Sequence, residues 1–235
     1  MIRKIVVINS KGGCGKTTLS TNLASYYAAN GYPSALLDYD PQDSATRWLS
    51  LRPEHLAKIH GVSAAHPPAG HFTRSFQMRV PPGTQRIILD TPASMKRMDL
   101  VEVLRDASAI IIPLLPSFID CRVTSAFIKD LGTEMRLHAP GAPIAIVANR
   151  VHRNTRAFQL LLQFLNEEGR PPVACLRDSQ YYVQAAAEGR GIHELKSNLT
   201  RADRDQWRSL IDWLETGRRD TDHDPLSVEK QAVIA

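Results

Sequence analysis

Long apolar runs, paired cysteines and a strong excess of one charge are all missing from this 235-residue sequence. No stretch of about 18 uninterrupted apolar residues occurs, so no segment is predicted to span a membrane. The first ten residues hold one short apolar run, too brief for a signal peptide. The three cysteines, Cys14, Cys121 and Cys175, form no C-x-x-C pair, which argues against a zinc site or a disulfide framework and suits a reducing compartment. We therefore expect a cytoplasmic protein.

The net charge of +5 permits attraction to a polyanion, but an excess of this size is also common on ordinary enzymes. Apolar residues make up 43% of the chain, enough for one core. The segment beyond Gly217 is polar with weak periodicity. We expect one domain over residues 1–216 and a tail over 217–235 that is disordered or contacts a partner.

Short apolar runs alternate with segments of helical spacing along the chain, the pattern of a mostly parallel sheet covered on both faces. The predicted strands are Lys4–Ile8, Ser34–Asp38, Arg86–Asp90, Ala109–Leu115, Ile144–Asn149 and Pro172–Leu176, with a short one around Val62. The predicted helices are Thr17–Asn30, Asp43–Leu51, Phe72–Arg79, Met98–Asp106, Arg122–His138, Thr155–Glu168, Tyr181–Glu188 and Ala202–Leu214. The pattern predicts a doubly wound α/β fold.

The stretch "KGGCGKTT" lies between the first predicted strand and the first predicted helix. A glycine-rich turn in this context brings backbone N–H groups and a positive helix end to one point, where they bind phosphate. Lys16 can reach the β- and γ-phosphates, Thr17 can offer its hydroxyl to Mg²⁺, and Thr18 can contact the α-phosphate. The predicted phosphate-binding residues are Gly12, Gly13, Cys14, Gly15, Lys16, Thr17 and Thr18.

Two carboxylate motifs follow later strands, where an open α/β sheet places its ligand crevice. In "LLDYDPQ", Asp38 and Asp40 are two residues apart as the chain leaves its strand, so Asp40 can face the crevice. In "IILDTPA", an apolar run delivers Asp90 to the carboxyl edge of the sheet, where it is a candidate Mg²⁺ partner through water.

Together, "KGGCGKTT", "DYDPQ" and "ILDTPA" resemble the ParA/MinD family of deviant Walker-box ATPases, over about Met1 to Leu214. The resemblance implies a P-loop NTPase fold of the SIMIBI type, ATP and Mg²⁺ as cofactors, and slow intrinsic hydrolysis. The resemblance explains why Ser10 stands where the usual pattern G-x-x-x-x-G-K-[ST] has its first glycine. It also implies that Lys11 is the signature lysine of the family, which reaches the other subunit's nucleotide in an ATP-bound dimer. Such a lysine offsets the repulsion between two triphosphates. Alternatively, Lys11 serves its own nucleotide.

The resemblance also implies roles for other residues. Asp40 matches the aspartate that positions the attacking water, so Lys11, Lys16 and Asp40 are the candidate catalytic residues. Thr17, Asp38 and Asp90 are the candidate Mg²⁺ residues. Asn149, Arg177 and Asp178 are expected near the adenine, although Asn149 could instead be a strand-end cap.

The family divides by what the dimer binds. Membrane-bound MinD-like members end in an amphipathic helix, whereas this tail carries Asp220, Asp222, Asp224 and Glu229, so no stable membrane anchor is expected. ParA-like members bind DNA without sequence preference. Candidate DNA contacts are Lys196, Arg201, Arg204 and Arg208, although arginines on one helix face can also be ordinary solvated residues.

These features predict a nucleoid-associated ATPase that dimerises with ATP, binds non-specific DNA and is released when a ParB-like or McdB-like adaptor stimulates hydrolysis. Its cargo would be a plasmid, a chromosome or a protein assembly such as a carboxysome. A MinD-like membrane-surface regulator and a biosynthetic enzyme resembling the cobyrinic acid amidation family stay open as alternatives. The nitrogenase iron-protein branch is disfavoured because the three cysteines lack the spacing for a shared cluster.

Overall fold

A parallel sheet of seven strands forms the centre of the computed structural model, which describes residues 2–66 and 73–217. The strands are β1 (Arg3–Val7), β2 (Ser34–Asp38), β3 (Ile59–Ser63), β4 (Arg86–Asp90), β5 (Ala109–Leu114), β6 (Ile144–Val151) and β7 (Ala174–Arg177). Their order across the sheet is β3-β2-β4-β1-β5-β6-β7, and every neighbouring pair is parallel. Three strands lie on each side of β1, with β2, β3 and β4 on one side and β5, β6 and β7 on the other, which confirms the predicted doubly wound α/β fold.

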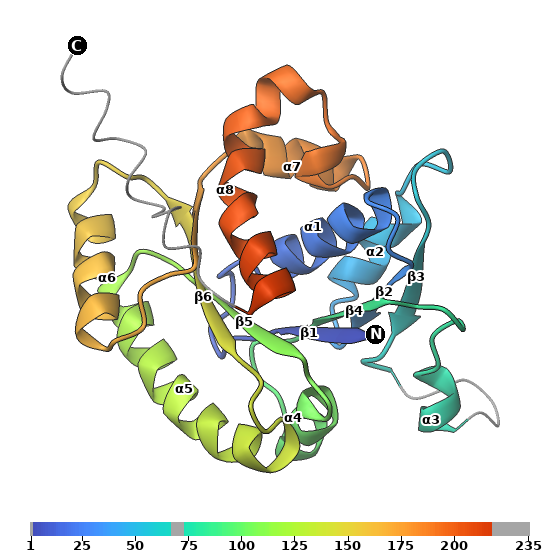
Figure 1. Ribbon diagram of the computed structural model, residues 1–235, viewed down its shortest axis with the longest axis horizontal. Coiled ribbons are helices and arrows are strands. Elements are labelled where there is room, and N and C mark those ends of the chain that lie inside the picture. The colour runs from blue at the N-terminus through green and yellow to red at the C-terminus, as the bar shows by residue number, and fades with distance from the viewer. Residues whose placement is uncertain (1, 67–72, 218–235) are drawn as a thin grey trace.

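Helices cover both faces of the sheet (Figure 1). One face carries α1 (Lys16–Ala29), α2 (Ser44–Ser50), α7 (Gln180–Ala187), the short 3₁₀ helix η1 (Ile192–Glu194) and α8 (Ser197–Thr216). The other face carries α4 (Arg97–Leu104), α5 (Phe118–His138) and α6 (Arg156–Glu167). The four-residue helix α3 (Arg74–Gln77) follows β3 in the chain.

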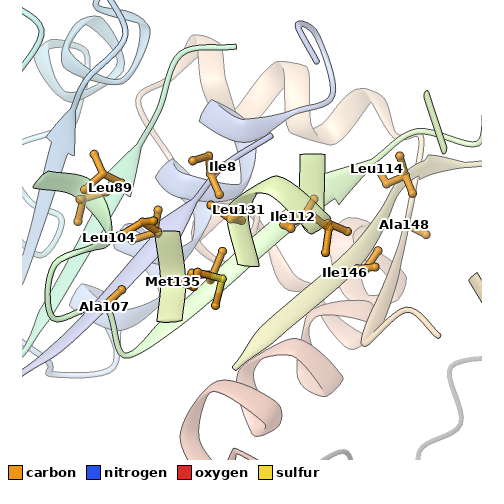
Figure 2. Close-up of a cluster of buried hydrophobic side chains, with 14 of the residues drawn as sticks. Ile8, Leu89, Leu104, Ala107, Ile112, Leu114, Leu131, Met135, Ile146 and Ala148 are labelled. Atoms are coloured by element: carbon orange, nitrogen blue, oxygen red, sulfur yellow. The ribbon is translucent and has the colours of Figure 1, made fainter. Parts of the chain in front are cut away.

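Two apolar cores result because successive strand residues point to opposite faces. In β1, Ile5 and Val7 belong to the core under α1 and α8, whereas Val6 belongs to the core under α4, α5 and α6. Figure 2 shows this second core, in which Leu131 and Met135 of α5 lie over strand residues such as Ile112. The strands are buried on both faces, which is why their sequences are nearly all apolar.

The expected element boundaries differ from the observed ones at several places. Helix α5 begins at Phe118 rather than Arg122, because Ser117 caps it by accepting a hydrogen bond from the Asp120 N–H. Helix α8 begins at Ser197 rather than Ala202, and β6 continues two residues past Asn149. The predicted helix Phe72–Arg79 is shorter, and its first residue lies outside the described residues, as does the predicted tail from residue 218 onward.

The sheet geometry places the candidate site. The order of strands reverses at β1, whose neighbours are β4 and β5, and ligands of open α/β sheets bind outside the carboxyl ends of strands at such a point. The loop after β1 holds the glycine-rich motif, and the loops after β2 and β4 hold the two aspartate motifs. Parallel strands bring all three to one edge.

Candidate functional site

The glycine-rich loop joins β1 to α1 in a conformation that depends on glycine. Gly13 and Gly15 have φ angles of 73° and 97°, in the left-handed region that side chains resist. Gly15 is also the N-cap of α1, and among the described residues no side chain caps the first turn of this helix. The uncapped N–H groups and the positive helix end therefore point toward a ligand, as anion binding requires.

Two asparagines hold the loop in place. Asn9 donates to Pro113 O at 2.7 Å and accepts from the Lys11 N–H at 3.2 Å. From the other side, Asn149 of β6 donates to Cys14 O at 2.8 Å. A Cβ atom on Gly15 would lie 2.1 Å from Asn149 Nδ2, so Asn149 also closes the space beside the loop. Sequence reasoning missed the role of Asn9, whose partner Pro113 is far away in the chain.

Lys16 and Lys11 point to different places. The Lys16 side chain is buried and its Nζ donates to Lys11 O at 2.8 Å, inside the turn of the loop. The Lys11 Nζ instead lies 3.0 Å from Asp120 Oδ1 in the first turn of α5, and its side chain is partly exposed. Cys14 is buried and its thiol donates to the same Lys11 carbonyl, at 3.2 Å. Burial raises the pKa of that thiol.

The two strand-end aspartates lie opposite each other, because Asp38 of β2 pairs in register with Asp90 of β4. Asp90 is fully buried; Oδ1 accepts from Ser20 Oγ at 3.1 Å, while Oδ2 has no hydrogen-bond partner within the described residues. Burial raises the pKa of Asp90 to about 7, and the nearby Asp38 adds to the shift. An orphaned carboxylate oxygen beside a phosphate-binding loop fits a divalent cation.

Asp38 has a second, structural task. Its Oδ1 accepts from the Asp40 N–H at 3.1 Å and its Oδ2 from the Thr46 N–H at 2.8 Å, and burial raises its pKa. These bonds order the loop that carries Asp40. Asp40 itself is partly exposed and accepts from the Gln42 N–H at 2.9 Å. A carboxylate held this way can orient a water molecule.

A cavity of about 480 Å³ brings most of the predicted residues together. It is lined by the predicted residues Gly12, Gly13, Gly15, Lys16, Thr17, Thr18, Asp40, Asn149, Arg177 and Asp178. Arg150 and Ser179, which adjoin predicted residues, also line it, and its remaining wall, which was not predicted, comes from Tyr182, Val183 and Ala186. Lys11, Cys14, Asp38 and Asp90 do not line it; the first contacts α5 and the other three are buried beside it. The volume suits a small-molecule ligand.

The candidate DNA contacts lie elsewhere on α8. Arg201, Arg204 and Arg208 line a second cavity of about 490 Å³, together with Asp205 and Asp212. Arg208 pairs with Asp205 at 2.9 Å, so the cavity carries both charges. Lys196 is exposed at the N-cap of α8 and does not line this cavity.

These features define a nucleotide-binding protein of the P-loop α/β class. The family model described as "CobQ/CobB/MinD/ParA nucleotide binding domain" matches residues 5–192, so the chain belongs to this family. The membership confirms the predicted ParA/MinD-type ATPase with its ATP and Mg²⁺ cofactors at the level of the family.

Among relatives of known sequence, the maintenance of carboxysome distribution protein A of Gloeobacter kilaueensis is 28% identical over 216 residues, covering 91% of this chain and 94% of the relative. The protein of the same name from Halothiobacillus neapolitanus is 26% identical, covering 81% and 87%. The chromosome-partitioning ATPase Soj of Thermus thermophilus is 31% identical, but covers only 48% of this chain and 55% of that protein.

Solved structures share the fold across the family's branches. A McdA–ATP complex from Cyanothece has a TM-score of 0.65 at 15% identity, covering 89% of this chain and 96% of that chain. The cobyrinic acid a,c-diamide synthase of Mycobacterium smegmatis with bound ATP analog and magnesium has a TM-score of 0.67 at 17% identity, covering 93% and 98%. The MinD protein of Pyrococcus horikoshii with Mg-ADP has 0.66 at 15%, covering 92% and 97%. The fold alone does not separate these branches.

Proposed function

We propose that this chain is a positioning ATPase that dimerises with ATP, binds DNA without sequence preference in that state, and is released when an adaptor stimulates hydrolysis. In this proposal residues 1–216 form the ATPase domain, and the protein is cytoplasmic and associated with the nucleoid. Two of the relatives that match most of the chain are named for carboxysome distribution, which supports a protein assembly as the cargo. A plasmid or chromosome is the alternative cargo.

The position of Lys11 is the observation that carries the proposal. Its ammonium group lies 3.0 Å from Asp120 and outside its own nucleotide cavity. A lysine serving its own nucleotide would be expected to face that cavity, as Lys16 does. A lysine on the rim is instead available to a second copy of the chain, where it offsets the charge of that copy's triphosphate.

The residues at this edge of the sheet have different roles in the proposed hydrolysis. The N–H groups of residues 12–18 and the Lys16 ammonium would hold the phosphates, and Thr17, Asp90 and Asp38 would hold Mg²⁺ directly or through water. When bound, Mg²⁺ neutralises the charge that develops on the phosphate oxygens. Asp40 would orient the attacking water. No arginine of this chain is assigned to transition-state stabilisation, so an adaptor that supplies a cation would raise a slow intrinsic rate.

The basic side of α8 would provide the DNA contacts, through Arg201, Arg204, Arg208 and Lys196. Each phosphate neutralised releases counterions, and two copies in a dimer double the number of contacts. Binding to DNA is then strong only in the ATP state. The alternative is a MinD-like regulator at a membrane surface. None of the helices in residues 2–66 and 73–217 combines the length and apolar character needed to cross a bilayer. A surface-lying amphipathic helix remains the form that this alternative would take.

Co-sedimentation with DNA, compared between ATP and ADP over a salt series, tests the proposal. We expect retention on mixed-sequence duplex DNA with ATP, falling steeply as salt rises. The triple variant of Arg201, Arg204 and Arg208 to Gln should lower the salt slope by about three per subunit. The matched control changes three exposed arginines of the opposite face, Arg105, Arg136 and Arg170, to Gln. Binding to anionic vesicles but not to DNA would support the MinD-like alternative and reject the proposal.

A further inference from the structure

Helix α8 is tied to the nucleotide cavity by an ion pair whose carboxylate is buried. Arg177, which lines that cavity, donates from Nε to Asp203 Oδ1 at 2.7 Å and from Nη2 to Asp203 Oδ2 at 2.8 Å. Asp203 is 0% exposed, whereas the Arg177 side chain is 40% exposed. The Asp203 hydrogen bonds raise the pKa of Arg177 further, so its guanidinium stays charged. A two-point contact of this kind fixes the plane of the guanidinium as well as its position.

Two more contacts join the same parts of the molecule. Gln206 accepts from the Arg177 backbone N–H through Oε1 at 2.9 Å. Trp207, which is fully buried, donates from Nε1 to the hydroxyl of Tyr182 at 2.9 Å, and Tyr182 also lines the nucleotide cavity. Three residues on one side of α8 therefore hold two residues of the cavity wall.

The neighbouring positions on α8 point to the other cavity. Arg204 follows Asp203 and Arg208 follows Trp207, and both arginines line the second cavity with Arg201. A helix is stiff over two turns, so a displacement that alters its contacts with Arg177 and Tyr182 also moves these arginines. One element is thus shared by the nucleotide cavity and by the basic cavity.

We propose that Asp203 is a positioning residue that holds Arg177 in place for the bound nucleotide, and that α8 thereby couples nucleotide binding to polyanion binding at Arg201, Arg204 and Arg208. With Nε and one N–H of Nη2 occupied by Asp203, Arg177 retains its Nη1 donors and its flat face for an oxygen or a base of a nucleoside triphosphate. The second half of the inference rests on the proposed DNA binding, whereas the first half does not.

The first experiment needs no DNA. Affinity for a non-hydrolysable ATP analogue with Mg²⁺ is measured by calorimetry for wild type, Asp203→Asn, Arg177→Gln and the charge-neutral double variant. We expect each single change to weaken binding about five- to twentyfold, and the double variant to be no weaker than either single one, because both changes remove the same contact. Because the proposed role of Arg177 is to hold the nucleotide, the KM for ATP should rise by a larger factor than kcat at saturating ATP falls.

Two further variants test whether the change in affinity comes from misfolding or from the loss of one charge. Arg177→Lys retains the charge that Asp203 needs but loses the two-point contact, so it should fold even where Asp203→Asn does not, and should weaken binding several-fold. Glu167→Gln, an exposed carboxylate on α6, is the matched control for loss of one negative charge and should bind as wild type does. Unchanged affinity in Arg177→Lys, or single effects that multiply in the double variant, would overturn the positioning role.

The second experiment measures the coupling. Analogue affinity is determined with and without mixed-sequence duplex DNA in a Lys11→Ala background, which removes the contribution of dimerisation. We expect DNA to tighten nucleotide binding, and the added double change at Asp203 and Arg177 to reduce that factor toward one while the three arginines of α8 stay intact. An equal factor in both proteins would reject the coupling. If neither monomeric protein binds DNA, the coupling is rejected, whereas the co-sedimentation of the wild-type dimer decides the proposed DNA function and the first experiment decides the role of Asp203.

Discussion

The ammonium group of Lys11 lies 3.0 Å from the Asp120 carboxylate, so the second lysine of the phosphate loop is bound to α5 of its own chain. Asp120 stands in the first turn of that helix, where the positive helix end stabilises its charge. Both side chains are partly accessible, and such a pair contributes about 1 kcal/mol or less. In the proposed dimer Lys11 must leave Asp120 and contact the phosphates of the other subunit. Because the Lys11–Asp120 pair is weak, breaking it makes the free energy of dimerisation only slightly less favourable.

Asp120→Asn should therefore make ATP-dependent dimerisation easier. Losing the competing pair frees Lys11 in both subunits, and we expect the protein concentration at half dimerisation to fall by up to about thirtyfold, about 1 kcal/mol for each of the two pairs. Light scattering with ATP and the hydrolysis-blocked Asp40→Ala background measures this. Asp130→Asn, an exposed carboxylate on the same helix, is the matched control. Weaker dimerisation in Asp120→Asn would mean that Asp120 supports the dimer rather than restraining Lys11.

The two lysines of the loop should respond differently to removal. Lys16→Ala deletes a buried ammonium group at the point where the loop amides converge, so we expect no measurable ATP binding by calorimetry. Lys11→Ala should still bind ATP, because Lys11 does not line the cavity, but should stay a monomer with ATP. An ATP-dependent dimer of Lys11→Ala would contradict the cross-subunit role.

Gly15→Ala should abolish nucleotide binding for a steric reason. At a φ of 97° the alanine is strained by about 1 kcal/mol or more, and its Cβ would lie 2.1 Å from Asn149 Nδ2. Gly31 separates the two effects, because its φ is 81° but a Cβ atom at this position would meet no atom of the described residues within 4 Å. Gly31→Ala should thus lower the melting temperature slightly and leave ATP affinity unchanged. Equal ATP affinity in both variants would show that the Asn149 contact is unimportant for the loop.

Much of this architecture follows from local sequence. The strands are recognisable because burial on both faces requires continuous apolar runs, and the phosphate loop because its glycines and lysine act within eight residues. Contacts between segments that are distant in the chain could not be predicted from local sequence. Nothing local to Asp120 or Asp203 indicates a partner at Lys11 or Arg177, because the fold alone brings these pairs together. The early start of α5 was missed because its cap, Ser117, precedes two apolar residues that resemble the end of a strand.

Asp40→Ala should separate binding from hydrolysis. Asp40 lines the cavity, but the only hydrogen bond of its side chain among the described residues is accepted from the Gln42 N–H, so its loss leaves the phosphate loop intact. We expect near-normal ATP affinity and ATP-dependent dimerisation, with hydrolysis reduced by about 10²-fold or more because the attacking water is no longer oriented. A phosphate-release assay measures the rate. Normal turnover would remove Asp40 from this role.

The stability of the protein should depend on His193 in mildly acidic solution. Its ring lies between Tyr26 and Trp207, and burial, aided by Arg204, lowers its pKa to about 4. Between pH 6.5 and pH 4 the unfolded chain therefore binds a proton at this histidine that the folded protein excludes, so the free energy of unfolding decreases as pH falls. From pH 6.5 to pH 5 the loss is at most about 2 kcal/mol.

His193→Phe keeps the aromatic contacts and removes the titration. Asp90 has the opposite effect over the same pH range, because its raised pKa favours the folded state at low pH. The informative quantity is therefore the difference in the free energy of unfolding between the variant and wild type. Urea unfolding at pH 7 and pH 5 should show a stability gap that shifts in favour of His193→Phe by about 1–2 kcal/mol at the lower pH. His55→Gln, at an exposed histidine, should leave the gap unchanged. A constant gap for His193→Phe would mean that the folded protein admits the proton as readily as the unfolded chain does.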